Sequence, residues 1–203
     1  RGIHQHLAPG LIIMAVLQNA FQNTSSSLTI SKVQGTSVDF LMPPLSPLEL
    51  TMGFIAGAAT RGIMVGLITG IAIKLLGLAD LQIFHVWAIV WFSLMASIIL
   101  GAFGAMGGIW AEKFDHLAAV TNFVIVPLTF LSGTFYDVNV LAEPFQTIAH
   151  FDPFFYLIDG FRYGFLGVAN SNLMVGVAVT GGLALFTSFL VWLMLRSGYK
   201  LKA

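Results

Sequence analysis

The sequence has very few charged residues and no cysteine. Only 9% of its 203 residues are Asp, Glu, Lys or Arg, whereas a soluble domain carries roughly a quarter. The missing cysteine excludes a disulfide framework and a thiolate metal site, and the formal net charge of +0 excludes a broad basic surface for nucleic acid. Hydrophobic residues make up 57% of the chain, and its mean hydropathy is +0.89. This composition indicates a membrane protein that binds lipid and no nucleic acid.

The common nucleotide-binding and catalytic motifs are also missing. There is no G-x-x-x-x-G-K-[S/T], so the chain itself is not expected to bind ATP or Mg. H-E-x-x-H is absent and the five histidines are scattered, so no metal site is expected. An intramembrane enzyme acting on lipid stays open as an alternative, with Ser132 or the Asp159-Gly160 pair as its starting point. An ion-coupled secondary transporter is the other alternative, although the sequence shows no internal repeat.

Several stretches are long and apolar enough to cross a bilayer as helices, which takes about 20 residues each. They lie near residues 7–25, 50–77, 84–110, 118–136 and 173–195. The first turns polar from Gln18 to Thr24, so its second half should face the protein interior; a short interfacial helix is the alternative. We therefore predict an all-α polytopic membrane protein with a single transmembrane domain over residues 1–203.

Lysine and arginine are distributed unevenly between the two sides that these spans define. One side holds Lys32, Lys113, Arg196, Lys200 and Lys202, and the other holds Arg1 and Arg162. Short cytoplasmic loops retain such residues, which places the C-terminus in the cytoplasm. With five spans the N-terminus would lie outside, so a further span is expected to precede residue 1, making six.

The second span carries a stripe of glycines and one charge. Gly62, Gly66 and Gly70 recur every four residues, which favours close helix packing. Arg61 lies deep in the same span. An intramembrane arginine snorkels to the surface, pairs with a partner or lines a wet pathway, and the sequence leaves these three interpretations open.

Residues 29–45 are predicted to form an amphipathic helix on the cytoplasmic surface. Apolar Ile30, Val33, Val38 and Leu41 alternate with polar residues, and the prolines from Pro43 onward end the helix. This segment is a candidate for the surface on which a cytoplasmic partner pushes; the alternative is a passive connector.

Residues 138–168 are apolar but too short for a crossing. Pro144 and Pro153 divide them into two pieces that we expect to be re-entrant helices in the outer leaflet. Their aromatic residues are expected at interface depth: Phe151, Phe154, Phe155, Tyr156, Phe161, Tyr163 and Phe165. Asp159 and Arg162 are three residues apart, so they should share a helix face and neutralise each other or reach a neighbouring helix.

The order of four stretches resembles a known family. "VQGTSVDFLMPPLSPLE", "TRGIMVGLITG", "VPLTFLSGTFYDV" and "PFQTIAHFDPFFYLIDGFRYGFLG" occur in this order before one last span. They resemble the permease subunit of bacterial type-2 ABC exporters, nearest the YadH-like branch. The outer motif, a proline, then aromatic residues, then D-G-x-R, carries most of the resemblance.

The resemblance implies a six-span exporter bundle of which the last five spans are present. Family members begin with an interface helix and a first span, expected before residue 1. It further implies a homodimer with a second permease copy in the bacterial inner membrane, and two copies of a cytoplasmic ABC ATPase carrying ATP and Mg. Substrates would be amphipathic, drug-like, lipid-linked or polysaccharide. By this analogy residues 29–45 form the coupling helix, with Gln34, Gly35, Thr36, Asp39, Phe40 and Leu41 meeting the ATPase, and Pro153, Tyr156, Asp159 and Arg162 belong to the outer gate.

Overall fold

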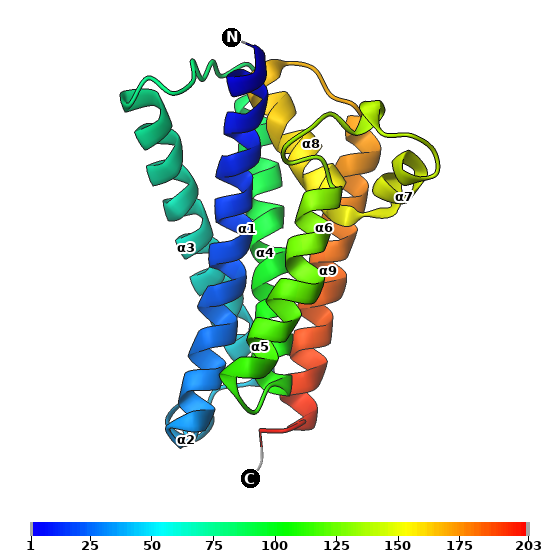
Figure 1. Ribbon diagram of the computed structural model, residues 1–203. Helices are drawn as coiled ribbons and strands as arrows, with labels where there is room; N and C mark the ends of the chain where they lie inside the picture. Colours follow the sequence, from blue (N-terminus) through cyan, green and yellow to red (C-terminus); the bar gives the residue numbers. More distant parts are fainter. Residues whose placement is uncertain (1, 202–203) are drawn as a thin grey trace.

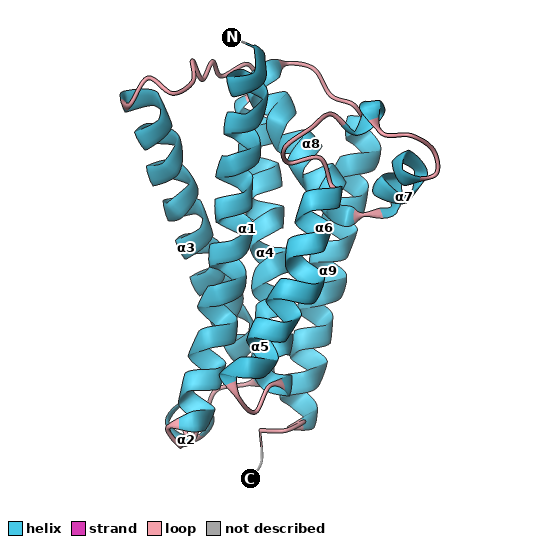
Figure 2. Cartoon of the chain, in the orientation of Figure 1, coloured by secondary structure: helices cyan, strands magenta, loops and turns pink. Residues whose placement is uncertain are grey.

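The computed structural model describes residues 2–201, without the side chains of Ile3 and Phe40, and every regular element in that range is helical (Figures 1 and 2). The α-helices are α1 (Gly2–Val33), α2 (Val38–Leu41), α3 (Pro47–Leu75), α4 (Val86–Trp110), α5 (Phe114–Val120), α6 (Val126–Leu131), α7 (Phe145–Phe151), α8 (Pro153–Leu166) and α9 (Leu173–Ser197). A π-helical turn (Thr121–Ile125) joins α5 to α6, and a 3₁₀ turn (Val138–Val140) precedes α7. The prediction of an all-α polytopic membrane protein is confirmed.

Within residues 2–201, four helical stretches are long and apolar enough to span a membrane. They are Pro47–Leu75, Val86–Trp110, Phe114–Leu131 and Leu173–Ser197, close to the second to fifth predicted spans. Helix α1 is not among them, but it runs beside α3 and α4 for most of its 32 residues (Figure 1). Ile13, Leu17 and Leu28 on α1 are fully buried. Because it forms part of the bundle core, α1 is not an interfacial helix.

Several hydroxyl groups in the polar half of α1 have hydrogen-bond partners, whereas the buried Thr29 Oγ1 has none among the described residues. Thr24 is buried, and its Oγ1 donates to the Gly101 carbonyl oxygen of α4 at 2.7 Å. Ser27 and Ser31 donate to the carbonyl oxygens four residues earlier in α1. The predicted inward orientation therefore holds for Thr24, but Gln22 is exposed.

Small residues bring α1, α3 and α4 close together. A Cβ on Gly62 would lie 2.6 Å from Ser97 Oγ of α4, and one on Gly66 would lie 2.7 Å from Val16 Cγ2 of α1. Gly70 meets only an ordinary contact with Ile12, at 3.6 Å. Gly66 and Gly70 also line an apolar cavity of about 250 Å³ between α1, α3, α4 and α8. The first two glycines of the stripe therefore pack helices tightly, and the third borders open space.

The fourth predicted span is displaced toward the N-terminus from its predicted bounds, 118–136. It begins at Phe114 and ends at Leu131, so residues 132–136 are not helical. Gly133 has φ +85°, which stops the helix, and Thr134 Oγ1 donates back to the Thr129 carbonyl oxygen at 2.9 Å. The π-helical turn lies just before Pro127, which lacks the N–H that an α-helix would require there.

The connections gather at two ends of the bundle. Segments 34–46, 111–113 and 198–201 lie at the end that we call the basic end, which holds Lys32, Lys113, Arg196 and Lys200. Segments 76–85, 132–152 and 167–172 lie at the other end, called the gate end (Figure 1). Arg1 and Lys202, which were used in the sequence-based orientation, lie outside the described residues.

Candidate functional site

Helix α8 is the centre of the gate end and is almost entirely buried. Asp152 caps its first turn, with Pro153 at the first helical position, and Gly167 at φ +71° ends it. Phe154, Phe155 and Phe161 are each at most 2% exposed, so these rings pack inside the protein and do not face lipid. These rings fill the core because α8 packs inside the bundle, whereas α7 lies at its flank and leaves Phe151 84% exposed (Figure 1).

Two glycines let α8 lie directly against α4. A Cβ on Gly160 would collide with the ring of Phe92, and one on Gly164 would collide with the Ile89 side chain. The Gly164 carbonyl oxygen also accepts hydrogen bonds from the backbone N–H groups of Phe84 and His85, at 2.9 and 3.0 Å. This contact was not predicted from the sequence, although the four-residue spacing of the two glycines is its signal.

Asp159 joins α8 to the loop that precedes α9. It is 2% exposed. Its Oδ1 accepts from the Asn170 N–H at 2.9 Å, and its Oδ2 accepts from the Ser171 N–H at 2.9 Å and the Ser171 hydroxyl at 2.6 Å. Three such bonds compensate much of the cost of burying a carboxylate. Asp159 therefore fixes the start of the last span.

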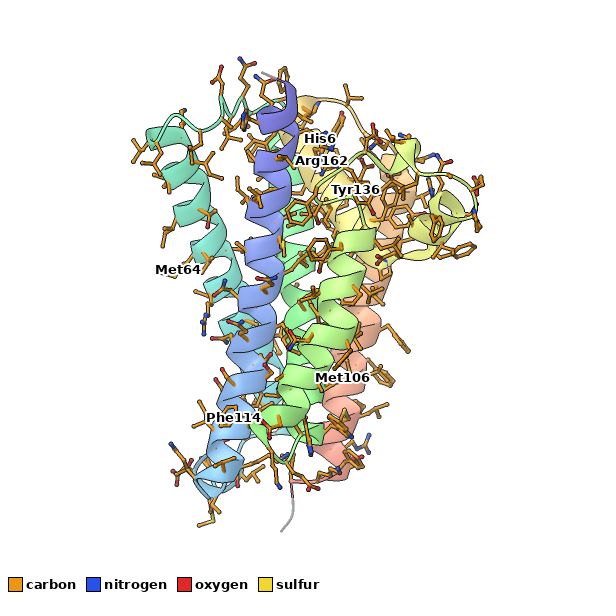
Figure 3. All side chains as sticks on the ribbon, viewed as in Figure 1. His6, Met64, Met106, Phe114, Tyr136 and Arg162 are labelled. Carbon is orange, nitrogen blue, oxygen red and sulfur yellow. The ribbon has the colours of Figure 1, made fainter. Side chains whose placement is uncertain are left out.

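Arg162 joins α8 to the turn that follows α6. It is 4% exposed, and its Nη2 donates to the carbonyl oxygens of Gly133 and Thr134 at 2.8 and 3.4 Å. Helix α1 also packs against this turn. Gly10 lies so close to it that a Cβ on Gly10 would be 2.5 Å from the Thr134 carbonyl oxygen. Figure 3 shows Arg162, Tyr136 and His6 gathered at this end. Arg162 thus connects α8, the 133–134 turn and, through that turn, α1.

The predicted mutual neutralisation of Asp159 and Arg162 is not what the structure shows. Within residues 2–201 the one ion pair with an N–O distance below 4 Å joins Lys200 and Glu112, at 3.5 Å. Asp159 and Arg162 share a helix, but each binds backbone groups of a different segment. Gly133 and Thr134 are buried, so without Arg162 their carbonyl oxygens would be buried without partners.

The other two predicted gate residues lie on the same helix. Pro153 begins α8, and the Tyr156 ring packs edge-on against Phe155 with 5.3 Å between ring centroids. Both are partly buried. The structure therefore brings all four predicted gate residues onto α8, and it adds Gly10, Asn170 and Ser171 from other segments.

Asp152 is an acid with one unpaired oxygen. Its Oδ1 accepts from the Phe154 N–H at 2.9 Å, whereas its Oδ2 is buried and has no partner among the described residues. Burial raises the pKa of Asp152 to about 6, against a lowering contribution from the Phe154 N–H. The pKa of Tyr136 is raised by its own burial and then by the Asp152 charge. Asp152 therefore changes charge near neutral pH.

At the basic end, residues 29–45 do not form the single amphipathic helix that was predicted. Residues 29–33 are the last turn of α1, residues 34–37 form a turn, and the separate helix α2 contains only Val38–Leu41. Gly35 at φ +71° lies in that turn, after which α1 does not continue. The prolines end α2, as predicted, and Ser46 and Glu49 form a capping box that starts α3.

The segment from Gln34 to Ser46 protrudes from the bundle, and nearly all of it is exposed. Gln34, Gly35, Thr36, Asp39 and Leu41 are all exposed, and the Phe40 side chain lies outside the described residues. Met42 is 77% exposed, and Val38 and Leu45 are also exposed. Lys32 anchors the start of the segment, because its Nζ donates to the carbonyl oxygens of Gly108, Ile109 and Ala111 at 3.1, 2.6 and 2.6 Å. The exposed apolar segment therefore follows directly after the end of α1, which Lys32 holds against α4.

Arg61 is exposed on α3, and its Nη2 lies 3.5 Å from Asn19 Oδ1 of α1. It is remote from α8 and from the basic end. The structure therefore separates the predicted site residues into three places: the α8 network, the Gln34–Ser46 segment and Arg61.

Comparison with known proteins identifies the family. The family model described as "ABC-2 type transporter" matches residues 2–166. The chain is 34% identical over 203 residues to the inner membrane transport permease YadH of Escherichia coli K12, covering 98% of this chain and 77% of that protein. It is 30% identical over 178 residues to nodulation protein J of Rhizobium leguminosarum bv. viciae, covering 84% and 66%. The relatives that are named for an activity are named as transport permeases, and none is named as an enzyme. The chain is a multi-pass membrane protein that belongs to the ABC-2 type transporter family, as a YadH-like permease.

Proposed function

We propose that this chain is the permease of an ABC exporter, in which two permease copies form the pathway and two cytoplasmic ATPase subunits drive it. The ATPase subunits would hold ATP and Mg, since this sequence has no Walker loop. The basic end would face the cytoplasm, which the concentration of Lys and Arg there favours. The bacterial inner membrane is the location of the YadH relative. The substrate would be an amphipathic, drug-like, lipid-linked or polysaccharide molecule that is moved outward.

The exposed Gln34–Ser46 segment carries this proposal. Val38, Leu41, Met42 and Leu45 present apolar surface at the end that would face the cytoplasm. Contiguous exposed apolar surface of this kind is typical of a protein–protein contact. In this proposal the groove of an ATPase subunit covers the segment, and Asp39 contributes a polar contact at its rim.

Helix α1 would transmit the movement of this segment to the gate end. It is one unbroken helix from Gly2 to Val33. Lys32 fixes one end of α1 to α4, and Gly10 lies against the Thr134 carbonyl oxygen near the other end. That carbonyl oxygen in turn accepts from Arg162 of α8. A tilt of α1 would therefore move the 133–134 turn and α8 together, which is how we expect the gate to open.

The test is to express the complete permease with the ATPase subunit encoded beside it and to measure ATP hydrolysis in lipid nanodiscs. We expect Asp39→Lys to lower transport-coupled hydrolysis at least several-fold while the permease stays folded. Asp80→Lys is the matched control, because Asp80 is an exposed acid at the gate end. Co-purification of the two subunits with a selective defect of Asp39→Lys supports the proposal. A permease that purifies alone under mild detergent, or equal effects of the two variants, contradicts it.

A further inference from the structure

Arg61 lies at the middle of a membrane-spanning helix. It is 14 residues from Pro47 and 14 from Leu75, the two ends of α3. The apolar core of a bilayer is about 30 Å thick, so the middle of such a span lies about 15 Å from either boundary. With bonds of about 1.5 Å, an extended arginine side chain reaches only about 7 Å. Snorkelling therefore does not bring the Arg61 guanidinium to the membrane surface.

The surroundings of Arg61 are polar, and they are open in the described structure. Arg61 is exposed, and Asn19 of α1 lies 3.5 Å from its Nη2. One helical turn along α3, a Cβ on Gly57 would lie 3.4 Å from Asn23 Nδ2, so that amide lies beside the same face of α3. Gln22, between the two asparagines in sequence, is exposed. Arg61, Asn19 and Asn23 form what we call the midspan cluster, and the exposed Gln22 adjoins Asn23 in the sequence.

The sequence offers the midspan cluster no carboxylate. Helices α1, α4 and α9 contain no Asp or Glu. Glu49 and Asp115 are in the first turns of α3 and α5, and Asp159, in the middle of α8, is bound to Asn170 and Ser171 at the gate end. The remaining acids lie in the segments at the two ends. A second copy of this chain has the same sequence, so it also supplies no midspan acid. An unpaired arginine at this depth costs at least about 2.5 kcal/mol, which makes an anionic or aqueous environment necessary.

We propose that the midspan cluster binds the anionic group of a transported amphiphile, such as a phosphate, sulfate or carboxylate attached to an apolar tail. The guanidinium supplies the charge and a forked pair of donors, which suits an oxyanion. The amide side chains add neutral donors and acceptors. This inference rests on the proposed permease function and names the substrate class of that pathway.

The absence of cysteine makes the cluster accessible to a direct chemical test. Gln22→Cys introduces a thiol next to Asn23 of the cluster, and the 203 residues contain no other. In the purified full-length permease, in phosphatidylcholine nanodiscs without ATP, the thiol is modified with an anionic or a cationic methanethiosulfonate reagent. The anionic-to-cationic rate ratio is compared between permeases with Arg61, Arg61→Lys and Arg61→Gln. Leu185→Cys, on an exposed face of α9, is the control position.

We expect Arg61→Gln to lower that rate ratio by about fivefold at position 22 and to leave it unchanged at position 185. Arg61→Lys should keep most of the ratio, because it keeps the charge. Dodecyl phosphate should slow labelling at position 22 only when the charge is present, whereas dodecyl maltoside should not. Protection by inorganic phosphate alone would also support an anion site, one that needs no apolar tail.

Three results would overturn the inference. They are a rate ratio that does not depend on Arg61, a position 22 that reacts with neither reagent, and equal protection by dodecyl phosphate and dodecyl maltoside. Labelling is measured without ATP, so it does not depend on coupling. A failure of the ATPase test with intact charge-dependent labelling would therefore count against the proposed function, and the reverse result would count against the midspan cluster alone.

Discussion

The clearest quantitative prediction concerns Asp152, the half-paired acid at the start of α8. Its pKa is about 6 in the folded protein, compared with the ordinary value of 3.8. A raised carboxyl pKa means that the folded state binds the proton more tightly than the unfolded state. The protonated form therefore folds without penalty at low pH, and stability is lost as the pH rises from about 4 through about 6. The full penalty is about 3 kcal/mol at neutral pH.

The perturbation is Asp152→Asn, which keeps an oxygen to accept from the Phe154 N–H but cannot ionise. The amide NH₂ group has to occupy the place of the unpaired Oδ2, and this adds a cost that does not depend on pH. Between about pH 4 and pH 7, the free energy of unfolding of the Asp152→Asn variant should therefore rise by about 2 kcal/mol relative to that of the unsubstituted protein. That corresponds to a relative shift in melting temperature of roughly 4–8 °C.

The assay is thermal unfolding of both proteins in the same mild detergent, followed by tryptophan fluorescence across this pH range. Other groups titrate in both proteins, so their effects cancel in the difference. A difference that stays constant with pH would refute the reasoning, because it would mean that water reaches the Asp152 carboxylate in the folded protein. A matched substitution of an exposed acid, Glu143→Gln, should show no such pH dependence.

Two further predictions concern the network at each end of the bundle. Lys32→Met should lower the melting temperature by several degrees, because three carbonyl oxygens at the end of α4 lose a charged donor; Lys113→Met, an exposed lysine at the same end, should change it little. The exchange Asp159→Arg with Arg162→Asp should be no more stable by thermal unfolding than Arg162→Asp alone, because each side chain binds a different backbone segment. Recovery in the exchanged protein would show that the two residues are partners after all.

The three predicted site regions have different structural characters. The α8 network is buried, and Asp159 and Arg162 bind backbone groups of other segments, while Asp152 Oδ2 and Arg162 Nε have no partner among the described residues. The Gln34–Ser46 segment is exposed and apolar, and the midspan cluster is exposed and polar. Helix α1 contacts or adjoins all three, through Gly10, Asn19 and Lys32. Its polar composition, which is unusual for a membrane span, follows from this central position.

The amino-acid sequence by itself determined the helical membrane class, four of the spans and the division into two unequal ends. These features follow from local composition, because a bilayer requires long apolar helices and prolines interrupt them. The family was also recognisable from short sequence motifs, which can be identified without knowledge of the tertiary contacts. The start of α3 and the two-piece form of residues 138–168 were predictable for the same local reason.

Only the tertiary structure decided where the buried charges and aromatic rings go. The partners of Asp159 and Arg162 are backbone groups 11 to 29 residues away, and no helical spacing reveals them. Likewise Phe154 and Phe161 are core residues because Gly160 and Gly164 bring α8 onto α4. The continuation of α1 to Val33 depends on Lys32 reaching carbonyl oxygens of α4. Spacing along one helix predicts which residues share a face, whereas a buried polar group bonds to whichever unsatisfied backbone group the packing brings within reach.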